Sequence, residues 1–79
     1  METLNRESKT ISNNETTANV YFDCFNSASR SFCVVYHYEY NKAGELVRSG
    51  CTQFDSAKVE PEARAIYNAV INAYEALLY

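Results

Sequence analysis

Phe32–Tyr40 (FCVVYHYEY) is the stretch that decides the fold of this chain. Aromatic and β-branched residues dominate it, which is typical of a β-strand. Successive side chains of a strand point to opposite faces. One face therefore takes Phe32, Val34, Tyr36, Tyr38 and Tyr40, and the other takes Cys33, Val35, His37 and Glu39. Both faces are largely apolar, so we expect both to be covered.

The segments on either side of this strand complete an antiparallel meander. Val20–Phe25 (VYFDCF) is short, aromatic and β-branched, and it predicts a first strand. Asn41–Gly44 (NKAG) has the composition of a hairpin turn, with Gly44 free to take positive φ. Glu45–Phe54 (ELVRSGCTQF) then predicts a returning strand that is weakened or bulged at Gly50.

The last segment predicts a helix. Pro61 is tolerated in a first helical turn, and Glu60 and Glu62 suit the positive end of the helix dipole. Apolar residues then recur at steps of three and four: Ile66, Tyr67, Val70, Ala73, Tyr74 and Leu77. The predicted fold class is α+β, a three-stranded antiparallel meander followed by one C-terminal helix, in a single domain over residues 19–79.

The first 18 residues (METLNRESKTISNNETTA) predict a disordered arm. Their apolar residues are Met1, Leu4, Ile11 and Ala18, and the rest is rich in Ser, Thr, Asn and Glu without a period. Such a segment buries too little apolar surface to offset its ordering entropy.

One helix covers one face of a sheet, so the other face is expected to meet a second copy or a protein partner. The candidate interface residues are Phe32, Val35, Tyr36, Tyr38, Tyr40, Leu78 and Tyr79. The tyrosine ladder of the central strand favours packing under the helix or a protein interface. A base-stacking platform is the alternative, but it needs a cationic groove.

The charge of the chain does not favour nucleic acid. The net charge is −3 and the pI is about 5.0. The basic residues of the predicted domain are scattered and form no stripe: Arg30, Lys42, Arg48, Lys58 and Arg64. Neither an apolar run near 18 residues nor a signal-peptide core is present, so the expectation is a cytoplasmic protein with no membrane association.

The three cysteines, Cys24, Cys33 and Cys51, form no close pair and each lies in an apolar run. They are expected to be reduced core residues. A zinc site of these cysteines with His37 lacks the usual ligand spacing. His37 itself is expected to be a strand-surface or hydrogen-bonded histidine rather than a catalytic base.

Residues 20–78 resemble the first half of a ribonuclease H domain. In that family a strand bearing an Asp precedes two antiparallel strands and a helix that opens with a Glu, and Asp23 and Glu62 stand at those places here. The resemblance implies that both are relict catalytic carboxylates holding at most one weakly bound magnesium ion. Cys24 stands where the family has a Gly, and the strands with the remaining acids would lie beyond Tyr79, so nuclease activity is not carried over.

The architecture is also similar to antitoxins of the HicB family, which act as toxin neutralisers. The sequence therefore predicts a small non-catalytic interaction module, plausibly a toxin neutraliser or a phage- or plasmid-encoded inhibitor of a defence system. The alternative is a divalent-metal-dependent nuclease or a nucleic-acid-binding protein whose site is completed by dimerisation or by a missing second half.

Overall fold

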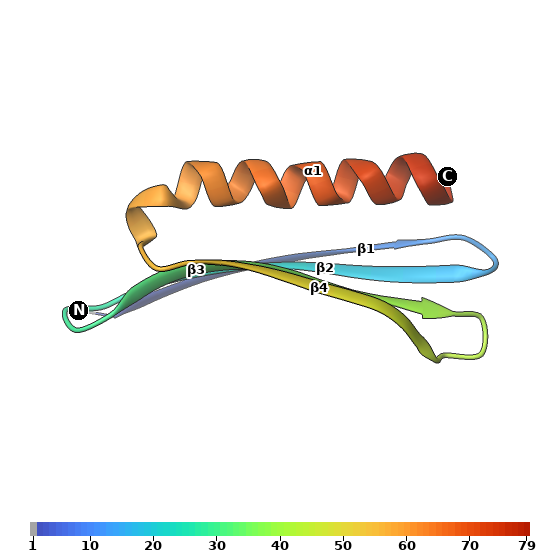
Figure 1. The fold of residues 1–79 in the computed structure, drawn as a ribbon, viewed down its shortest axis with the longest axis horizontal. Coiled ribbons are helices and arrows are strands. Elements are labelled where there is room, and N and C mark those ends of the chain that lie inside the picture. The colour runs from blue at the N-terminus through green and yellow to red at the C-terminus, as the bar shows by residue number, and fades with distance from the viewer. Residues whose placement is uncertain (1) are drawn as a thin grey trace.

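The computed structural model describes residues 2–79 and has an α+β architecture, as predicted (Figure 1). One antiparallel sheet has the strand order β1-β2-β3-β4, and a helix lies lengthwise above it. The elements are β1 (Thr3–Ser12), β2 (Thr16–Asn26), β3 (Ser31–Asn41), β4 (Leu46–Phe54), the short 3₁₀ helix η1 (Ala57–Val59) and α1 (Glu60–Leu78). In the described part of the chain, no helix is long and apolar enough to span a membrane.

Strand β1 contradicts the prediction of a disordered arm. It pairs with β2 over its full length, from Thr3 opposite Asn26 to Ser12 opposite Thr17. The meander therefore has four strands instead of three. Of the ten residues of β1, only Ile11 is buried, and its side chain is 0% exposed.

Polar contacts explain why β1 is ordered despite its composition. On the face towards the helix, Lys9 Nζ lies 3.1 Å from Glu75 Oε2, and Glu7 pairs with Arg64 across 2.6 Å. At the hairpin, the Asn13 side-chain oxygen accepts hydrogen bonds from the backbone N–H groups of residues 15 and 16. The Asn13 amide group also donates to the carbonyl of Leu78, at 3.0 Å. These contacts stand in for the apolar pattern that usually marks a strand.

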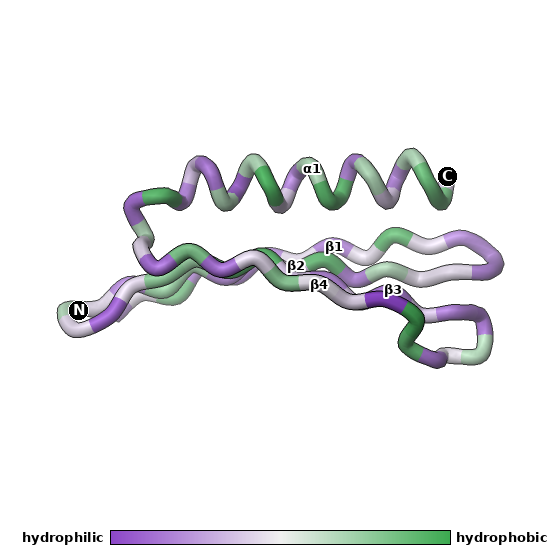
Figure 2. Tube along the Cα trace, in the orientation of Figure 1, coloured by the Kyte–Doolittle hydropathy of each residue, from purple (hydrophilic) through white to green (hydrophobic). Residues whose placement is uncertain are grey.

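The core lies between the sheet and the helix. Its members come from alternate positions of β2 and β3 and from one stripe of α1: Ile11, Ala18, Val20, Phe22, Cys24, Cys33, Val35, Ala63, Tyr67, Ile71, Tyr74 and Leu78. The helix α1 is amphipathic as predicted, and Figure 2 shows hydrophilic and hydrophobic residues alternating along it. Its buried stripe differs from the predicted one: of the predicted positions, Tyr67 and Tyr74 are buried and Ile66 and Val70 partly so, whereas Ala73 is exposed. The buried stripe includes Leu78, whereas Leu77 is exposed.

The helix packs on β2, β3 and β1, and of β4 only Phe54 packs against the core. The hairpin that joins β3 to β4 bends away from the helix, while the β1–β2 hairpin stays beneath its C-terminal end (Figure 1). A register shift in the β3–β4 ladder falls between Glu39 and Tyr40, not at Gly50. Gly50 has a different role, because the imidazole of His37 occupies the space above it and a Cβ there would lie 2.5 Å from the ring.

Candidate functional site

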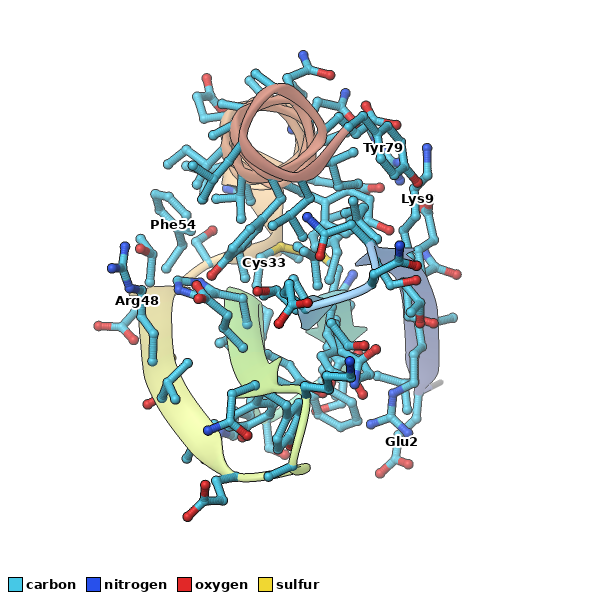
Figure 3. All side chains as sticks on the ribbon, turned by 90° about the vertical axis from the view of Figure 1, so that its right-hand side faces the viewer. Glu2, Lys9, Cys33, Arg48, Phe54 and Tyr79 are labelled. Carbon is cyan, nitrogen blue, oxygen red and sulfur yellow. A yellow bond between two sulfur atoms is a disulfide. The ribbon has the colours of Figure 1, made fainter. Side chains whose placement is uncertain are left out.

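The sheet face opposite the helix carries a continuous set of aromatic side chains. Residues of β2 and β3 alternate between the two faces, and the set that points away from the core comprises Tyr21, Phe25, Phe32, Val34, Tyr36, Tyr38 and Tyr40. We call these seven residues the aromatic face. Within residues 2–79 no helix or strand covers it, and Figure 3 shows side chains gathered on this side of the sheet. The face is the candidate functional site.

The rings of the aromatic face hold one another in fixed positions. Tyr21 and Tyr36 lie directly opposite in the β2–β3 ladder and stack with their centroids 4.8 Å apart. Tyr38 meets both rings edge-on, each at 6.1 Å. Phe25 and Phe32 form a second cross-strand pair with centroids 5.5 Å apart. Aromatic pairs of this kind contribute about 0.5–1.5 kcal/mol beyond their buried area, so the surface is preorganised.

Asp23 lies in the middle of the aromatic face and is fully paired within the chain. The guanidinium of Arg6 donates to both carboxylate oxygens, at 2.9 and 3.2 Å. The hydroxyl of Tyr36 donates to the same carboxylate at 3.1 Å. Burial and the hydrogen bond to Asp23 raise the pKa of Tyr36, and the hydrogen bond to Asp23 also raises the pKa of Arg6. These three side chains therefore fix the ring of Tyr36 from its hydroxyl end.

The aromatic side of the sheet is electrically neutral. Among the strand residues that point away from the helix, Arg6 and Asp23 carry charge, and they neutralise each other. Arg30, in the loop between β2 and β3, lies 4.9 Å from the centre of the Phe32 ring. A surface that binds a nucleic-acid backbone needs a row of unpaired cations. The strand residues of this face supply no such row.

The structure does not bring Asp23 and Glu62 together within one chain. Asp23 points to the aromatic face, while Glu62 is an exposed residue in the first turn of α1, on the other side of the sheet. Asp23 pairs instead with Arg6, a residue of the segment predicted to be disordered. Among residues 2–79 no cluster of three or more potential metal ligands occurs. The weak magnesium site assigned to these two carboxylates has no support in this arrangement.

Two of the predicted interface residues belong to the core. Val35 lies beneath the helix and Leu78 packs against the sheet, so both are unavailable to a partner. The helix packs over the Cys33 and Val35 side of β3, where both residues are buried. Tyr79 is 74% exposed at the end of α1, away from the aromatic face. Phe32, Tyr36, Tyr38 and Tyr40 are the predicted interface residues that the open face retains.

The predicted interface lacks Tyr21, Phe25 and Val34 of the aromatic face, and it lacks Arg6, which pairs with Asp23 there. Tyr21 and Phe25 alternate with Phe22 and Cys24 in β2, and this period is visible in the sequence. Arg6 could not be assigned, because it lies in the segment predicted to be disordered. His37 points to the helix side, where its ring meets that of Tyr74 edge-on at 5.6 Å. It is a packed residue, in agreement with its expected structural role.

The prediction of three reduced cysteines is wrong. Cys24 and Cys33 lie directly opposite in β2 and β3 and form a disulfide beneath the helix (Figure 3). Cys51 is a free, exposed cysteine on the aromatic side, opposite Tyr36. Disulfides are most common in oxidising compartments. The disulfide therefore gives no support to the expectation of a cytoplasmic location.

Comparisons of the chain with models of known protein families, with curated protein sequences and with solved structures find no match. The resemblances to half of a ribonuclease H domain and to HicB-type antitoxins therefore stay predictions. What the protein does has to be argued from its own surface.

Proposed function

We propose that this protein is a non-catalytic binding module that recognises another protein through its aromatic face. The observation that carries the proposal is a neutral, uncovered layer of interlocked aromatic rings on one side of the sheet. Tyrosine and phenylalanine are well suited to such a role, because each buries a large rigid body at a small cost in conformational entropy. Tyrosine hydroxyls add hydrogen bonds at the rim of the interface.

The rigidity of the face favours a partner that docks onto a preformed surface. Tyr36 is held by its stack on Tyr21 and by its hydrogen bond to Asp23. Side chains that are already ordered lose little entropy when a partner binds. A small inhibitor acts in the same way, because it binds and masks a surface of its partner. For the biological setting of this protein we propose a role as a toxin neutraliser or an inhibitor of a defence system.

The test compares two tyrosine variants as bait for proteins from the cells that produce this chain. Tyr38→Ala alters the aromatic face, where this residue is 37% exposed, and Tyr79→Ala is the control at the exposed end of the helix. We expect a partner that wild type and Tyr79→Ala retain and Tyr38→Ala loses. With the purified partner, loss of a central aromatic residue should weaken binding about thirtyfold, the equivalent of about 2 kcal/mol.

Two results would overturn the proposal. A partner that binds wild type and Tyr38→Ala with equal affinity uses another surface. Retention of single-stranded DNA or RNA at physiological salt, lost in Tyr38→Ala, would make the face a base-stacking platform instead. Circular dichroism and urea unfolding of each variant show whether a loss of binding reflects the surface or the fold.

A further inference from the structure

The two edges of the sheet differ in how well they are protected against pairing with another strand. The edge strand β1 carries Arg6, Glu7 and Lys9 among its ten residues, and each forms an ion pair with another element. The edge strand β4 (LVRSGCTQF) has no proline and one charged residue, Arg48. Charged side chains and prolines are the usual protection of sheet edges. The outer edge of β4 is therefore open to an incoming strand.

The helix does not obstruct this edge. It packs on β1, β2 and β3, so the first eight residues of β4 lie outside the core. Figure 3 looks along the helix and shows Arg48 at the outer edge of the sheet. Most residues of β4 are exposed, and Leu46 and Val47 are exposed apolar residues. An approaching strand would meet neither the helix nor a loop.

We infer that β4 pairs antiparallel with β4 of a second copy of this chain, which joins two four-stranded sheets into one. The twofold axis stands perpendicular to the sheet, because this places like faces side by side. On the aromatic side β4 presents uncharged residues, namely Leu46, Ser49, Cys51 and Gln53, while its helix side presents Arg48. The opposite arrangement would set the apolar border of one copy beside the arginine of the other.

We choose a second copy over a foreign peptide because of the charge of β4 and because of the size of the aromatic surface that two joined sheets share. The aromatic side of β4 carries no charge, and the one charged residue of the strand, Arg48, faces an uncharged residue of the second copy (Thr52 in full overlap), so the strand can pair with itself without like-charge repulsion. The joined sheet also makes one continuous aromatic surface from two aromatic faces. The inference concerns a different surface from the proposed binding function, and each can fail without the other.

Pairing of the two β4 strands would bring the Cys51 side chains of the two copies close together, so Cys51 can be used to detect it. Full overlap of Leu46–Phe54 with its copy sets Gly50 opposite Gly50, which leaves the two Cys51 side chains two residues apart along the strands, a separation of about 8 Å. Pairing that begins after the irregularity near Val47 instead sets Cys51 opposite Cys51. In both registers the two side chains are neighbours on the aromatic side.

The experiment introduces charge at this position and measures mass by sedimentation equilibrium. Wild type is expected at twice the chain mass of 9.0 kDa. Cys51→Lys alone and Cys51→Glu alone should each weaken association at least tenfold, because like charges become neighbours. An equimolar mixture of the two should restore the dimer, which also shows that both variants fold. Ser8→Lys, on the aromatic side of the other edge strand, is the matched control and should remain dimeric.

A second measurement uses the free thiol directly. A short bis-maleimide should link two wild-type chains, since one Cys51 thiol adds across the double bond of each maleimide ring, and Cys51→Ser should prevent this. The inference is overturned if wild type sediments at 9.0 kDa up to about 100 μM, which would place the Kd above that value. It is equally overturned if the mixed variants stay monomeric, or if Ser8→Lys dissociates the dimer as Cys51→Lys does.

Discussion

Replacing Ile11 by Ala should destabilise the protein far more than its place in a polar segment suggests. Ile11 is the buried residue of β1 and is 0% exposed, in contact with the core beneath the C-terminal half of the helix. The change removes three side-chain carbons, which is worth about 2.4 kcal/mol at about 0.8 kcal/mol for each buried methylene. The cavity that remains raises the expected loss to about 3–4 kcal/mol.

This loss is large against the total stability of so small a chain. At about 0.05–0.15 kcal/mol per residue, 79 residues give a free energy of unfolding of about 4–12 kcal/mol. With a urea m-value of about 1 kcal/mol/M, the unfolding midpoint of Ile11→Ala should fall by about 3–4 M. Amide exchange should show that β1 loses protection first, because its other contacts are polar and exposed.

Leu4→Ala is the matched control, since Leu4 lies in the same strand but is 52% exposed on the aromatic side. Its free energy of unfolding should stay within about 0.5 kcal/mol of wild type. If Ile11→Ala behaves like Leu4→Ala, or if the wild-type amides of residues 3–12 exchange at the rate of an unfolded peptide, then β1 is not anchored through Ile11 and the four-stranded description is wrong.

Three further predictions test the covalent link, the central carboxylate and the buried phenols. Thiol titration of the unreduced protein in denaturant should find one free thiol, that of Cys51, and a titre of three would contradict the disulfide. A reductant should lower the free energy of unfolding by about 2.5 kcal/mol, as expected for a disulfide that closes a loop of this length. Asp23→Ala should lower the free energy of unfolding, because it removes the acceptor of the half-buried Tyr36 hydroxyl and the partner of the exposed Arg6, while Glu62→Ala should change it little. Neither wild type nor variant should hydrolyse RNA–DNA hybrids with magnesium, and turnover that is lost in Asp23→Ala would support the nuclease alternative. Burial raises the pKa of the Tyr67 hydroxyl above the ordinary 10.0, so the folded chain holds this proton more tightly than the unfolded chain does. The stability that this provides is present below pH 10 and should be lost as the pH rises through the folded pKa. Tyr67→Phe should therefore lose less stability between pH 9 and 12 than wild type.

The strands and the helix of the second half could be predicted because their patterns are strong. β3 alternates over its whole length, and α1 repeats apolar residues at helical spacing after a proline in its first turn. β1 could not be predicted in the same way. Its helix-side residues Glu7 and Lys9 are held by charges on α1 that lie more than 50 residues away in the sequence, and no local pattern reports such pairs.

The sequence predicts that one face of the sheet is uncovered, but it does not identify all the residues of that face. One helix leaves one face of a sheet uncovered, and this follows from element count alone. Which face is covered depends on how β2 and β3 pair, because Val20 and Phe22 join the side of Cys33 and Val35 in the observed register, and a slip of one residue would separate them. The centre of that side is made of the buried residues Val20, Phe22, Cys33 and Val35, whereas the tyrosines on the other side need water or partners at their hydroxyl groups.

The same register decides the chemistry of the cysteines. Ser27–Arg30 closes the β2–β3 hairpin with a hydrogen bond from the N–H of Ser27 to the carbonyl of Arg30, at 2.8 Å. This turn sets Phe25 opposite Phe32 and therefore Cys24 opposite Cys33. A turn one residue longer or shorter would place Cys24 beside a residue of the opposite face. The disulfide and the aromatic pair thus depend on one short polar loop, and a change in the length of this loop should remove both the covalent link and the stacked binding surface.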